Sequence, residues 1–525
     1  MFSSSWRARL AWAAALAFAG ACLFGRYLLQ SRTNGVDADA AAVALQAQDM
    51  LHGNLLLHGW LVADVPFYTT ELPEYAMVEA IRGLGPDDMH VCAALTYTLL
   101  ALATALVARG PARGREGIAR ALIAGGIMVA PELGYGTNTL LASPDHTGTG
   151  VPVMAILLLI DRMRPRWYVP PVVLILLTWV IMADSLAIVA AAGPIAAVCL
   201  VRAVFRLARR RGDAEPAWYD LALAAAAVAS VPLSQATLAA IHAHGGFYVH
   251  PLPGQTFASA SALPHQLRAV GLCMLILFGA DMVGQPPGLM IAIAILHVAG
   301  LVLACLGLLA GIWRFFGPLT GRENRIPQIL VAGTFALLAA GWLGTHVTSG
   351  FDAHEIAIVL PFAAALAGRM LGSWAIRPWL APALAIVLAG YLAALGVAST
   401  QPASAISNQP LANWLVAHHL DHGLAGYWQA NSVNLDSGGL VTLAPIFGGA
   451  PYVWEAESSW YDPRVSYANF VVSVSSPPAE SVFTRPSVML RVFGHPAQTF
   501  RFGPYTVMVW HQNLLTRLES IPSTG

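Results

Sequence analysis

Long apolar runs separated by short polar segments occupy most of the chain between residues 8 and 398. A helix needs about 20 consecutive, mainly apolar residues to cross a bilayer. By this criterion the pattern predicts eleven transmembrane helices, of which the one at 149–162 is short. They are expected at residues 8–29, 89–109, 117–136, 149–162, 167–183, 185–206, 216–242, 288–314, 326–347, 354–371 and 378–398. The pattern therefore predicts an α-helical polytopic membrane protein.

Arginines predict how these helices are oriented. Arginines are concentrated at every second connection between the predicted helices. These groups are Arg7/Arg9, Arg109–Arg120, Arg162–Arg166, Arg202–Arg211, Arg314–Arg325 and Arg369/Arg377. Because positively charged connections stay in the cytoplasm, we predict a cytoplasmic N-terminus in a multi-pass plasma-membrane protein. The loop at 34–88 and the C-terminal region are then extracytoplasmic. No small-residue cleavage site follows the first apolar run, so we expect it to be retained as a helix.

The composition changes after the last predicted helix. Residues 399–410 are rich in Ser, Pro and Asn, which is typical of a linker. Residues 411–525 then predict a small extracytoplasmic α/β domain, with helices at 411–422 and 486–494. Strand-like runs lie at 440–447, 452–460, 468–474 and 505–510. A further apolar piece, 263–283, is expected to lie in the membrane interface rather than to cross the membrane.

The amino-acid composition argues against several classes of function. The chain has 525 residues, of which 57% are hydrophobic and 11% are charged, and its formal net charge is zero. This balance gives no electrostatic case for nucleic-acid binding. All 28 basic residues are arginine, so mechanisms that need a Schiff-base lysine or a P-loop lysine are excluded.

The loop at 34–88 is the first place where chemistry is expected. It carries nine carboxylates and a single basic residue, Arg82. Asp37 precedes a predicted helix at 38–52, where it could serve only as an N-cap. Alternatively, the positive end of the helix keeps Asp37 ionised, so that it can take a proton from an attacking hydroxyl. Asp39 completes a DxD pair that could share a divalent cation, although no metal is established by this spacing.

Aromatic and acidic residues continue along the same loop. Tyr68, Glu71 and Glu74 belong to the stretch DVPFYTTELPEYAMVEAIRGL. An aromatic belt at the membrane surface explains Tyr68 without any function. Ring stacking on a sugar, with hydrogen bonds from Glu71 and Glu74, is the functional interpretation.

Two more polar stretches lie at predicted helix entries on the same side of the membrane. SPDHTGTG contains Asp145 and His146, and FDAHE contains His354 and Glu355. Asp145 could be a helix cap, and together these residues could form a substrate or ion site. The histidines and acids could gather a metal, but no established metal motif is present.

These stretches resemble the GT-C superfamily of multi-spanning glycosyltransferases that use polyprenyl-phosphate sugars. The resemblance is carried by an acid just after the first helix (Asp37), by PFYTTELPEYAMVEAIRGLG and by the acid in SPDHTGTG. It also includes HEIAIVLP with Glu355 and Pro361, together with an external C-terminal domain. The stretches DMLHGN, FYTTELP and SPDHTGTG are similar to a branch of actinobacterial integral membrane proteins.

The resemblance implies inverting sugar transfer from a polyprenyl-phosphate donor, with Asp37 as the base. The acceptor would be a cell-envelope glycan, lipid or protein outside the cytoplasm. Threonine and glutamate stand where the family often has a basic residue in its proline/tyrosine motif. We therefore expect Arg268 to bind the donor phosphate; anchoring to lipid headgroups is the alternative.

Two other functions stay open at this point. A transporter or flippase of a lipid-linked substrate would place ionisable residues near the middle of the membrane. The predicted helices contain mainly His297 and acids near their ends, such as Glu132 and Asp184. A non-catalytic cell-envelope scaffold is the third alternative.

Overall fold

The computed structural model describes residues 3–209, 216–250, 256–316, 320–406, 408–475 and 480–519. The chain forms two compact units, each built from three segments. The helical unit contains Met1–Asn34, Ala93–Ala236 and Gly254–Ala403, and the loop unit contains Gly35–Cys92, Thr237–Pro253 and Ser404–Gly525. Arg210 and Arg211, which contributed to the predicted orientation, lie outside the described residues.

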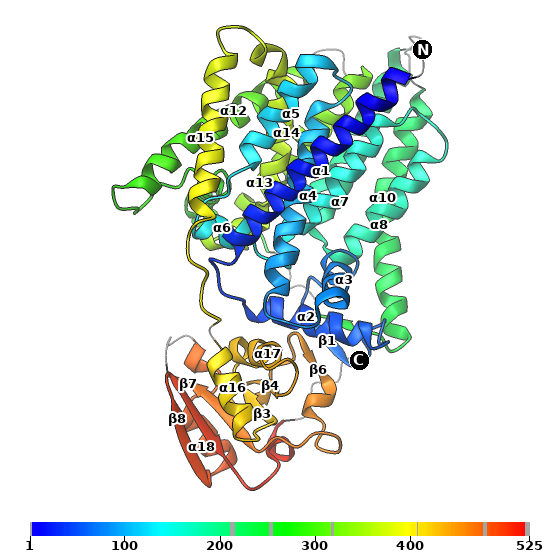
Figure 1. The fold of residues 1–525 in the computed structure, drawn as a ribbon. Coiled ribbons are helices and arrows are strands. Elements are labelled where there is room, and N and C mark those ends of the chain that lie inside the picture. Colours follow the sequence, from blue (N-terminus) through cyan, green and yellow to red (C-terminus); the bar gives the residue numbers. More distant parts are fainter. Residues whose placement is uncertain are drawn as a thin grey trace. The chain divides into compact units, whose positions relative to one another are not determined.

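Helices make up the first unit (Figure 1). Its long helices are α1 (Ser3–Ser31), α4 (Asp88–Arg109), α5 (Gly114–Met128), α7 (His146–Arg162), α8 (Val169–Ala183), α9 (Gly193–Arg209), α10 (Ala217–Ala243), α12 (Leu289–Trp313), α13 (Arg325–Leu343), α14 (Val359–Ala375) and α15 (Ala381–Ala398). Shorter elements connect them, including α6 (Tyr135–Leu140), η1 (Ile188–Ala192), α11 (Leu263–Leu277) and η4 (Gly350–Ile356).

Every predicted transmembrane segment coincides with a helix, but fewer of these helices are long enough to span. Within the described residues, seven are long and apolar enough to cross a membrane. The number is eight when η4 and α14, which meet at a bend of 62°, count as one span. The other three, α5, α7 and α8, have 15 to 17 residues. The prediction of eleven spans is therefore higher than the helix lengths support.

Helix α14 forms the centre of the helical unit. It packs against α5, α12 and α13 (Figure 1), and nearly all of its apolar side chains are buried. The contact with α12 depends on Gly307, because an added Cβ there would lie 2.5 Å from the backbone of Ala367. Small residues thus allow close helix packing, as is common in membrane proteins.

Three arginines and one aspartate form a buried ion cluster in the helical unit. Asp220 of α10 is paired with Arg206 at 2.9 Å and with Arg325 at 2.9 Å, while Arg202 lies 3.6 Å away. Arg202 also donates to the carbonyl oxygens of Thr320 and Gly321. All four charged residues are buried. Their pairing offsets the free-energy cost of removing these charges from water.

The loop unit joins the predicted loop at 34–88 to the C-terminal region. Its helices include α2 (Ala38–Leu51), α3 (Glu71–Arg82), α16 (Gln409–Ala417), α17 (Tyr427–Asp436) and α18 (Pro486–Phe493), and α2 packs against both α3 and α17. Strand β1 (Trp60–Val62) pairs in parallel with β2 (Tyr248–Val249) and antiparallel with β6 (Ala456–Glu457). This small sheet ties together three segments that are far apart in the sequence.

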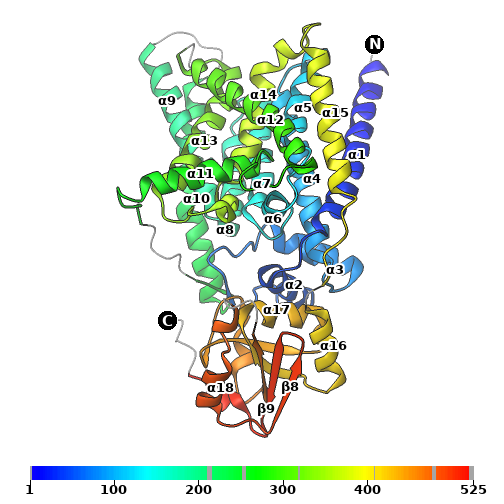
Figure 2. The same cartoon turned by 90° about the vertical axis from the view of Figure 1, so that its left-hand side faces the viewer.

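A mixed six-stranded sheet carries the rest of the loop unit. Its order is β5-β4-β3-β7-β9-β8, with β3 (His422–Ala425), β4 (Thr442–Phe447), β5 (Ala450–Pro451), β7 (Phe470–Val474), β8 (Gln498–Phe502) and β9 (Tyr505–Val509). Figure 2 shows β8 and β9 side by side as a hairpin. The predicted C-terminal α/β fold is confirmed. The elements α17, β3, β5 and β8 were not predicted, and the run at 452–460 forms only the short β6 and a 3₁₀ turn.

Candidate functional sites

The helical unit brings four of the predicted site residues together, and we call them, with Asp184, the histidine cluster. His146 begins α7, and its Nε2 lies 3.9 Å from one carboxylate oxygen of Glu355. His354 of η4 has its own Nε2 3.9 Å from the other oxygen of Glu355. The two imidazole rings stack with their centroids 5.8 Å apart. Asp145 joins this group through its electrostatic interaction with both histidines.

Asp184 fixes the orientation of His146. The buried carboxylate accepts hydrogen bonds from His146 Nδ1 at 2.8 Å, from Thr149 Oγ1 at 2.5 Å and from the backbone N–H of Leu186 at 2.8 Å. Burial alone would raise the pKa of Asp184, but the charge and hydrogen bond of His146 hold the pKa below its usual value. Burial alone would lower the pKa of His146, but the charge and hydrogen bond of Asp184 raise it. His146 thus contacts Asp184 through Nδ1 and directs Nε2 toward Glu355.

Asp145 occupies the N-cap position of α7 but does not cap the helix with its side chain. Its Oδ1 is buried without a hydrogen-bond partner, and burial raises the pKa of its carboxyl group. In η4 the N-cap is Ser349, and the carboxylate of Asp352 at N3 completes a capping box by accepting hydrogen bonds from the backbone N–H groups of Thr348 and Ser349. Asp145 is thus available to the histidine cluster rather than committed to helix capping.

Arg268 lies on α11, and its side chain is exposed. Helix α11 packs against η4, and His265 Nε2 lies 3.1 Å from the carbonyl oxygen of Thr348. Arg268 therefore belongs to a helix that contacts the segment carrying His354 and Glu355.

No metal site is evident in the parts of the chain that the structure describes. Among these residues, no group of three or more His, Cys, Asp or Glu side chains is arranged to hold a metal ion. The sharing of a divalent cation by Asp37 and Asp39 stays a prediction.

Asp37 and Asp39 belong to a second site, in the loop unit, that we call the carboxyl cluster: Asp37, Asp39, Tyr427 and Glu455. Asp37 is the N-cap of α2, and one of its carboxylate oxygens accepts from the backbone N–H of Ala40 at 2.8 Å. Its side chain is exposed, whereas Glu455 and Tyr427 are buried. The Tyr427 hydroxyl hydrogen bonds with Asp39 and lies 2.8 Å from Glu455 Oε2.

Counting hydrogens shows that the carboxyl cluster holds an extra proton. The Tyr427 hydroxyl has one hydrogen, yet it contacts two carboxyl groups. Asp39 and Glu455 also interact directly with each other through a side-chain hydrogen bond. Two ionised carboxylates cannot make these contacts without repulsion, so one of them is protonated. Burial, and then the negative charge of Asp39, raise the pKa of Glu455, and we infer that Glu455 carries this proton.

The backbone at Glu455 is strained. Its φ of 46° lies in the left-handed region, which non-glycine residues rarely adopt, and its side chain is only 3% exposed. Asn431 Nδ2 donates to the Glu455 carbonyl oxygen at 3.0 Å and supports this conformation. Strained residues of this kind gather at functional sites, where the surrounding structure holds them in place.

Glu71, Glu74 and Tyr68 lie elsewhere in the loop unit. The charges of Glu71 and Glu74 act on the Cys92 thiol, as do those of Glu79 and Asp88. Tyr68 donates its hydroxyl to the carbonyl oxygen of Leu55 at 2.8 Å, and its ring packs against Phe247. The interactions described here place Tyr68 in the packing of the loop unit, and its role in sugar binding stays a prediction.

A row of aromatic rings leads from the carboxyl cluster across the loop unit. Tyr427, Tyr452, Phe483 and Phe447 follow one another with ring centroids 5.4 Å apart. Trp428 packs beside Tyr427 at 5.3 Å. Trp428 and Phe447 are 42% and 48% exposed, so both ends of this aromatic row are open to a ligand.

Sequence reasoning missed Glu455 and did not recognise the role of Asp184. Glu455 lies in the C-terminal domain, inside the strand-like run predicted at 452–460. A lone acid among aromatics, in PYVWEAESSWYDP, was the available signal for Glu455. Asp184 was noted only as an acid at the end of a predicted helix. No local signal links it to His146, which lies 38 positions earlier.

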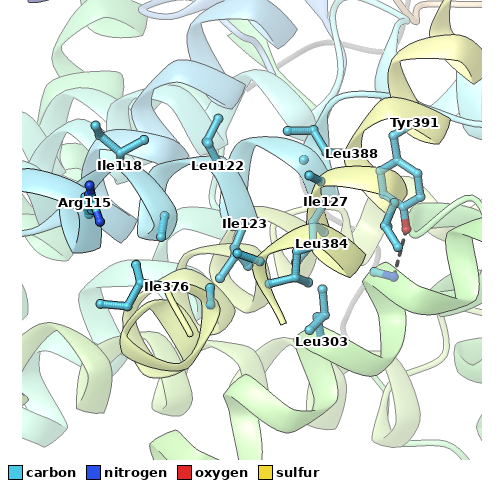
Figure 3. A pocket seen from close by; sticks show the side chains of 17 residues that line it. Arg115, Ile118, Leu122, Ile123, Ile127, Leu303, Ile376, Leu384, Leu388 and Tyr391 are labelled. Carbon is cyan, nitrogen blue, oxygen red and sulfur yellow. Dashed lines mark hydrogen bonds between the residues drawn. The ribbon is translucent and has the colours of Figure 1, made fainter. Parts of the chain in front are cut away.

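An apolar groove also opens on the helical unit. It has a volume of about 430 Å³ and is walled by small and branched residues of α5, α12, α14 and α15. Figure 3 shows Arg115 at one end and Tyr391 at the other, with the hydroxyl of Tyr391 accepting the Gly300 N–H at 2.8 Å. These walls offer almost no polar groups to a substrate.

Comparison with known proteins gives a distant structural likeness. No protein-family model matches the chain, and no curated protein matches it. Among solved structures, the archaeal oligosaccharyltransferase AglB from Archaeoglobus fulgidus in complex with an inhibitory peptide and a dolichol-phosphate is 13% identical. That match covers 88% of this chain and 69% of AglB, with a TM-score of 0.47. The Archaeoglobus fulgidus oligosaccharyltransferase in the apo form is 14% identical, with 90% and 70% covered and a TM-score of 0.48.

AglB is a member of the GT-C superfamily, the family that the sequence motifs resemble. At these identities and TM-scores, we rest no argument on the likeness.

Proposed function

We propose that the chain is a membrane-bound glycosyltransferase that moves a sugar from a polyprenyl-phosphate donor to an acceptor outside the cytoplasm. The geometry of Asp37 is the observation that carries this proposal. The carboxylate is exposed, held by the Ala40 N–H and placed at the positive end of α2. The helix dipole favours its ionised form. An accessible, oriented and ionised carboxylate is what a general base requires.

The proposed reaction inverts the configuration of the sugar. Asp37 takes the proton of the acceptor hydroxyl while the acceptor oxygen forms a bond to the anomeric carbon. The bond between that carbon and the phosphate oxygen breaks, and polyprenyl phosphate leaves with the electron pair. The proton ends on Asp37 and is then lost to solvent, so that the carboxylate is ready for another cycle.

Asp39 has a different role in this proposal. Its contacts with Tyr427 and Glu455 commit it to the interior of the loop unit. It anchors the first turn of α2, and hence Asp37, to α17. The aromatic row that begins at Tyr427 is well suited to stack against the sugar rings or the aromatic side chains of an acceptor.

The histidine cluster is proposed to bind the donor. A phosphate leaving group needs cationic partners, and the imidazolium of His146 supplies one. Arg268 is the second candidate, since it lies on the helix that packs against η4. Because the described side chains form no metal-ready group, no step is assigned to a divalent cation.

The test is a turnover assay on purified, reconstituted protein with a polyprenyl-phosphate sugar. We expect release of polyprenyl phosphate, and we expect Asp37→Asn to reduce the rate by at least ~10²-fold, as for other positioned bases. Asp87→Asn is the matched control, because Asp87 lies in the same loop and pairs with Arg82 on the surface. Normal turnover by Asp37→Asn would remove Asp37 from the mechanism. Movement of the intact lipid-linked sugar across vesicles without release would indicate a flippase.

A further inference from the structure

A small polar cavity in the helical unit is used by neither proposed site. It has a volume of about 70 Å³ and is lined by three ionisable residues from separate segments: Glu132, Asp281 and His297. Glu132 follows α5, Asp281 follows α11, and His297 lies within α12. Ionisable groups inside a membrane domain cost folding free energy and are usually functional. The meeting of three such residues at one cavity therefore indicates a ligand-binding site.

His297 presents a hydrogen-bond acceptor to the cavity. Its side chain is 2% exposed and hydrogen bonds to the backbone of Gly279. The atom that faces Gly279 is Nδ1, because a Cβ added at this glycine would lie 2.1 Å from it, and the φ of +68° also favours glycine. A neutral imidazole has a single N–H. Since Nδ1 donates it to Gly279, Nε2 carries a lone pair, and it is buried without a partner.

The two acids add further acceptors. Glu132 Oε2 is buried without a hydrogen-bond partner, and the charge of Asp281 acts on the Glu132 carboxylate. One oxygen of Asp281 accepts the Val283 N–H at 2.9 Å. Apart from the amide of Gln285, the side chains that line the cavity offer no N–H or O–H donor. The lining is thus acidic and rich in acceptors.

Aromatic packing keeps His297 in this position. The Tyr391 ring contacts the imidazole edge to face at 4.5 Å, and its hydroxyl donates to the His297 carbonyl oxygen at 3.1 Å. Met290, Ile293 and Ala394 complete the cavity with apolar walls. The site therefore combines a fixed imidazole, two carboxylates and a small apolar surface.

We propose that this cavity binds a small protonated amine, such as an ammonium ion or a primary alkylammonium group. An –NH₃⁺ group has three donors and no acceptor, which matches the Glu132 carboxylate, the Asp281 carboxylate and His297 Nε2. Its positive charge offsets two carboxylates in a low-dielectric surrounding, and the apolar walls accept its methylene carbon. A directly coordinated metal is a poorer match, because the described residues form no metal-ready group. The inference stands whether or not the chain transfers sugars.

The test compares amines that differ only in their donors, on full-length protein purified in detergent. Methylammonium is expected to raise the thermal unfolding midpoint saturably, whereas tetramethylammonium, which has no N–H, is expected to have no effect at equal ionic strength. Glu132→Gln and Asp281→Asn should each weaken the apparent affinity at least ~10-fold, the scale of one lost charge-assisted hydrogen bond. Glu116→Gln, at a surface pair with Arg120, should leave the affinity unchanged.

A second measurement does not depend on folded variants. With ¹⁵N-labelled ammonium, the wild-type protein should slow proton exchange of the bound ion relative to the free ion. The proposal would be overturned if tetramethylammonium or sodium raised the unfolding midpoint as much as methylammonium, or if Glu132→Gln left the response unchanged. Unprotected ammonium protons in the wild-type protein would also overturn it.

Discussion

The proton held between Asp39 and Glu455 leads to a sharp prediction about Tyr427. Tyr427→Phe removes the one hydroxyl that contacts both carboxyl groups. Hydrogen bonds to charged groups contribute about 1.5–3 kcal/mol, and Asp39 keeps its charge in the variant. For a domain of 150–250 residues, each kcal/mol shifts the unfolding midpoint by about 2–4 °C. We therefore expect Tyr427→Phe to lower the midpoint by roughly 3–12 °C.

Glu455→Gln distinguishes a protonated Glu455 from an ionised one. The glutamine amide can donate to Asp39, and its carbonyl oxygen can accept from Tyr427, so it reproduces the protonated carboxyl. We expect a loss below about 1 kcal/mol for Glu455→Gln. Glu455→Ala removes this contact from the buried Tyr427 hydroxyl and from Asp39, and should cost about 2–4 kcal/mol.

The contribution of Glu455 to the free energy of unfolding depends on pH with a definite sign. The pKa of Glu455 is raised in the folded protein, so the folded state holds the proton more firmly than the unfolded state. Its stabilising effect is complete below the ordinary glutamate pKa and is lost as pH rises toward the raised value. Glu455→Gln cannot titrate, so its stability relative to wild type should improve as pH rises.

Thermal unfolding followed by tryptophan fluorescence, on detergent-purified protein at several pH values, measures these effects. Tyr467→Phe is the matched control, because Tyr467 is half-exposed and its hydroxyl donates only to the His511 carbonyl oxygen at 3.2 Å. A Tyr427→Phe midpoint that equals that of wild type would refute the shared-proton reasoning. A Glu455→Gln variant with an unchanged pH profile would refute the assignment of the proton to Glu455.

Three further predictions follow from buried groups. Asp184→Asn should leave the protein folded but remove the charge that keeps His146 protonated, so that the NMR titration of His146 shifts to lower pH; an unchanged titration would contradict this. Burial raises the pKa of Asp436 from 3.8 to about 7. This difference of about three pKa units corresponds to at most roughly 4 kcal/mol in the free energy of unfolding. Stability is therefore lost as pH rises through this range, and Asp436→Asn should raise the unfolding midpoint at pH 8 but not at pH 4. Asp220→Asn removes the only carboxylate from the buried ion cluster of α10 and should cost about 3–5 kcal/mol, measured as loss of folded protein on gel filtration; normal yield would contradict this.

The sequence predicted the helices well because their apolar runs are local. It could not predict that residues 35–92 and 237–253 group with the C-terminal segment, because that grouping depends on pairings such as Leu61 with Tyr248 and Ala456. Strands of two or three residues leave almost no periodic signal. The length of α5 was overestimated because a polar turn interrupts its apolar run, whereas α7 begins earlier than the predicted 149–162.

The candidate sites were predicted in part for a similar reason. His146 and Asp145 were adjacent in a polar stretch at a predicted helix entry, and so were His354 and Glu355. Asp184 and Glu455 each stood alone among apolar or aromatic residues. A single acid in such a place more often marks the end of a helix or strand than a functional site. Only the folded chain shows that each of them contacts a predicted residue.

The two interpretations of Asp37 are compatible, and the choice of substitution separates them. As an N-cap, Asp37 stabilises α2 by about 1 kcal/mol, and asparagine caps helices nearly as well. Asp37→Asn should thus preserve the cap while removing the base, whereas Asp37→Ala removes both. If Asp37 is only a cap, the two variants will differ in stability and share normal turnover. If Asp37 is the base, both will lose turnover, and only the alanine variant will lose stability as well.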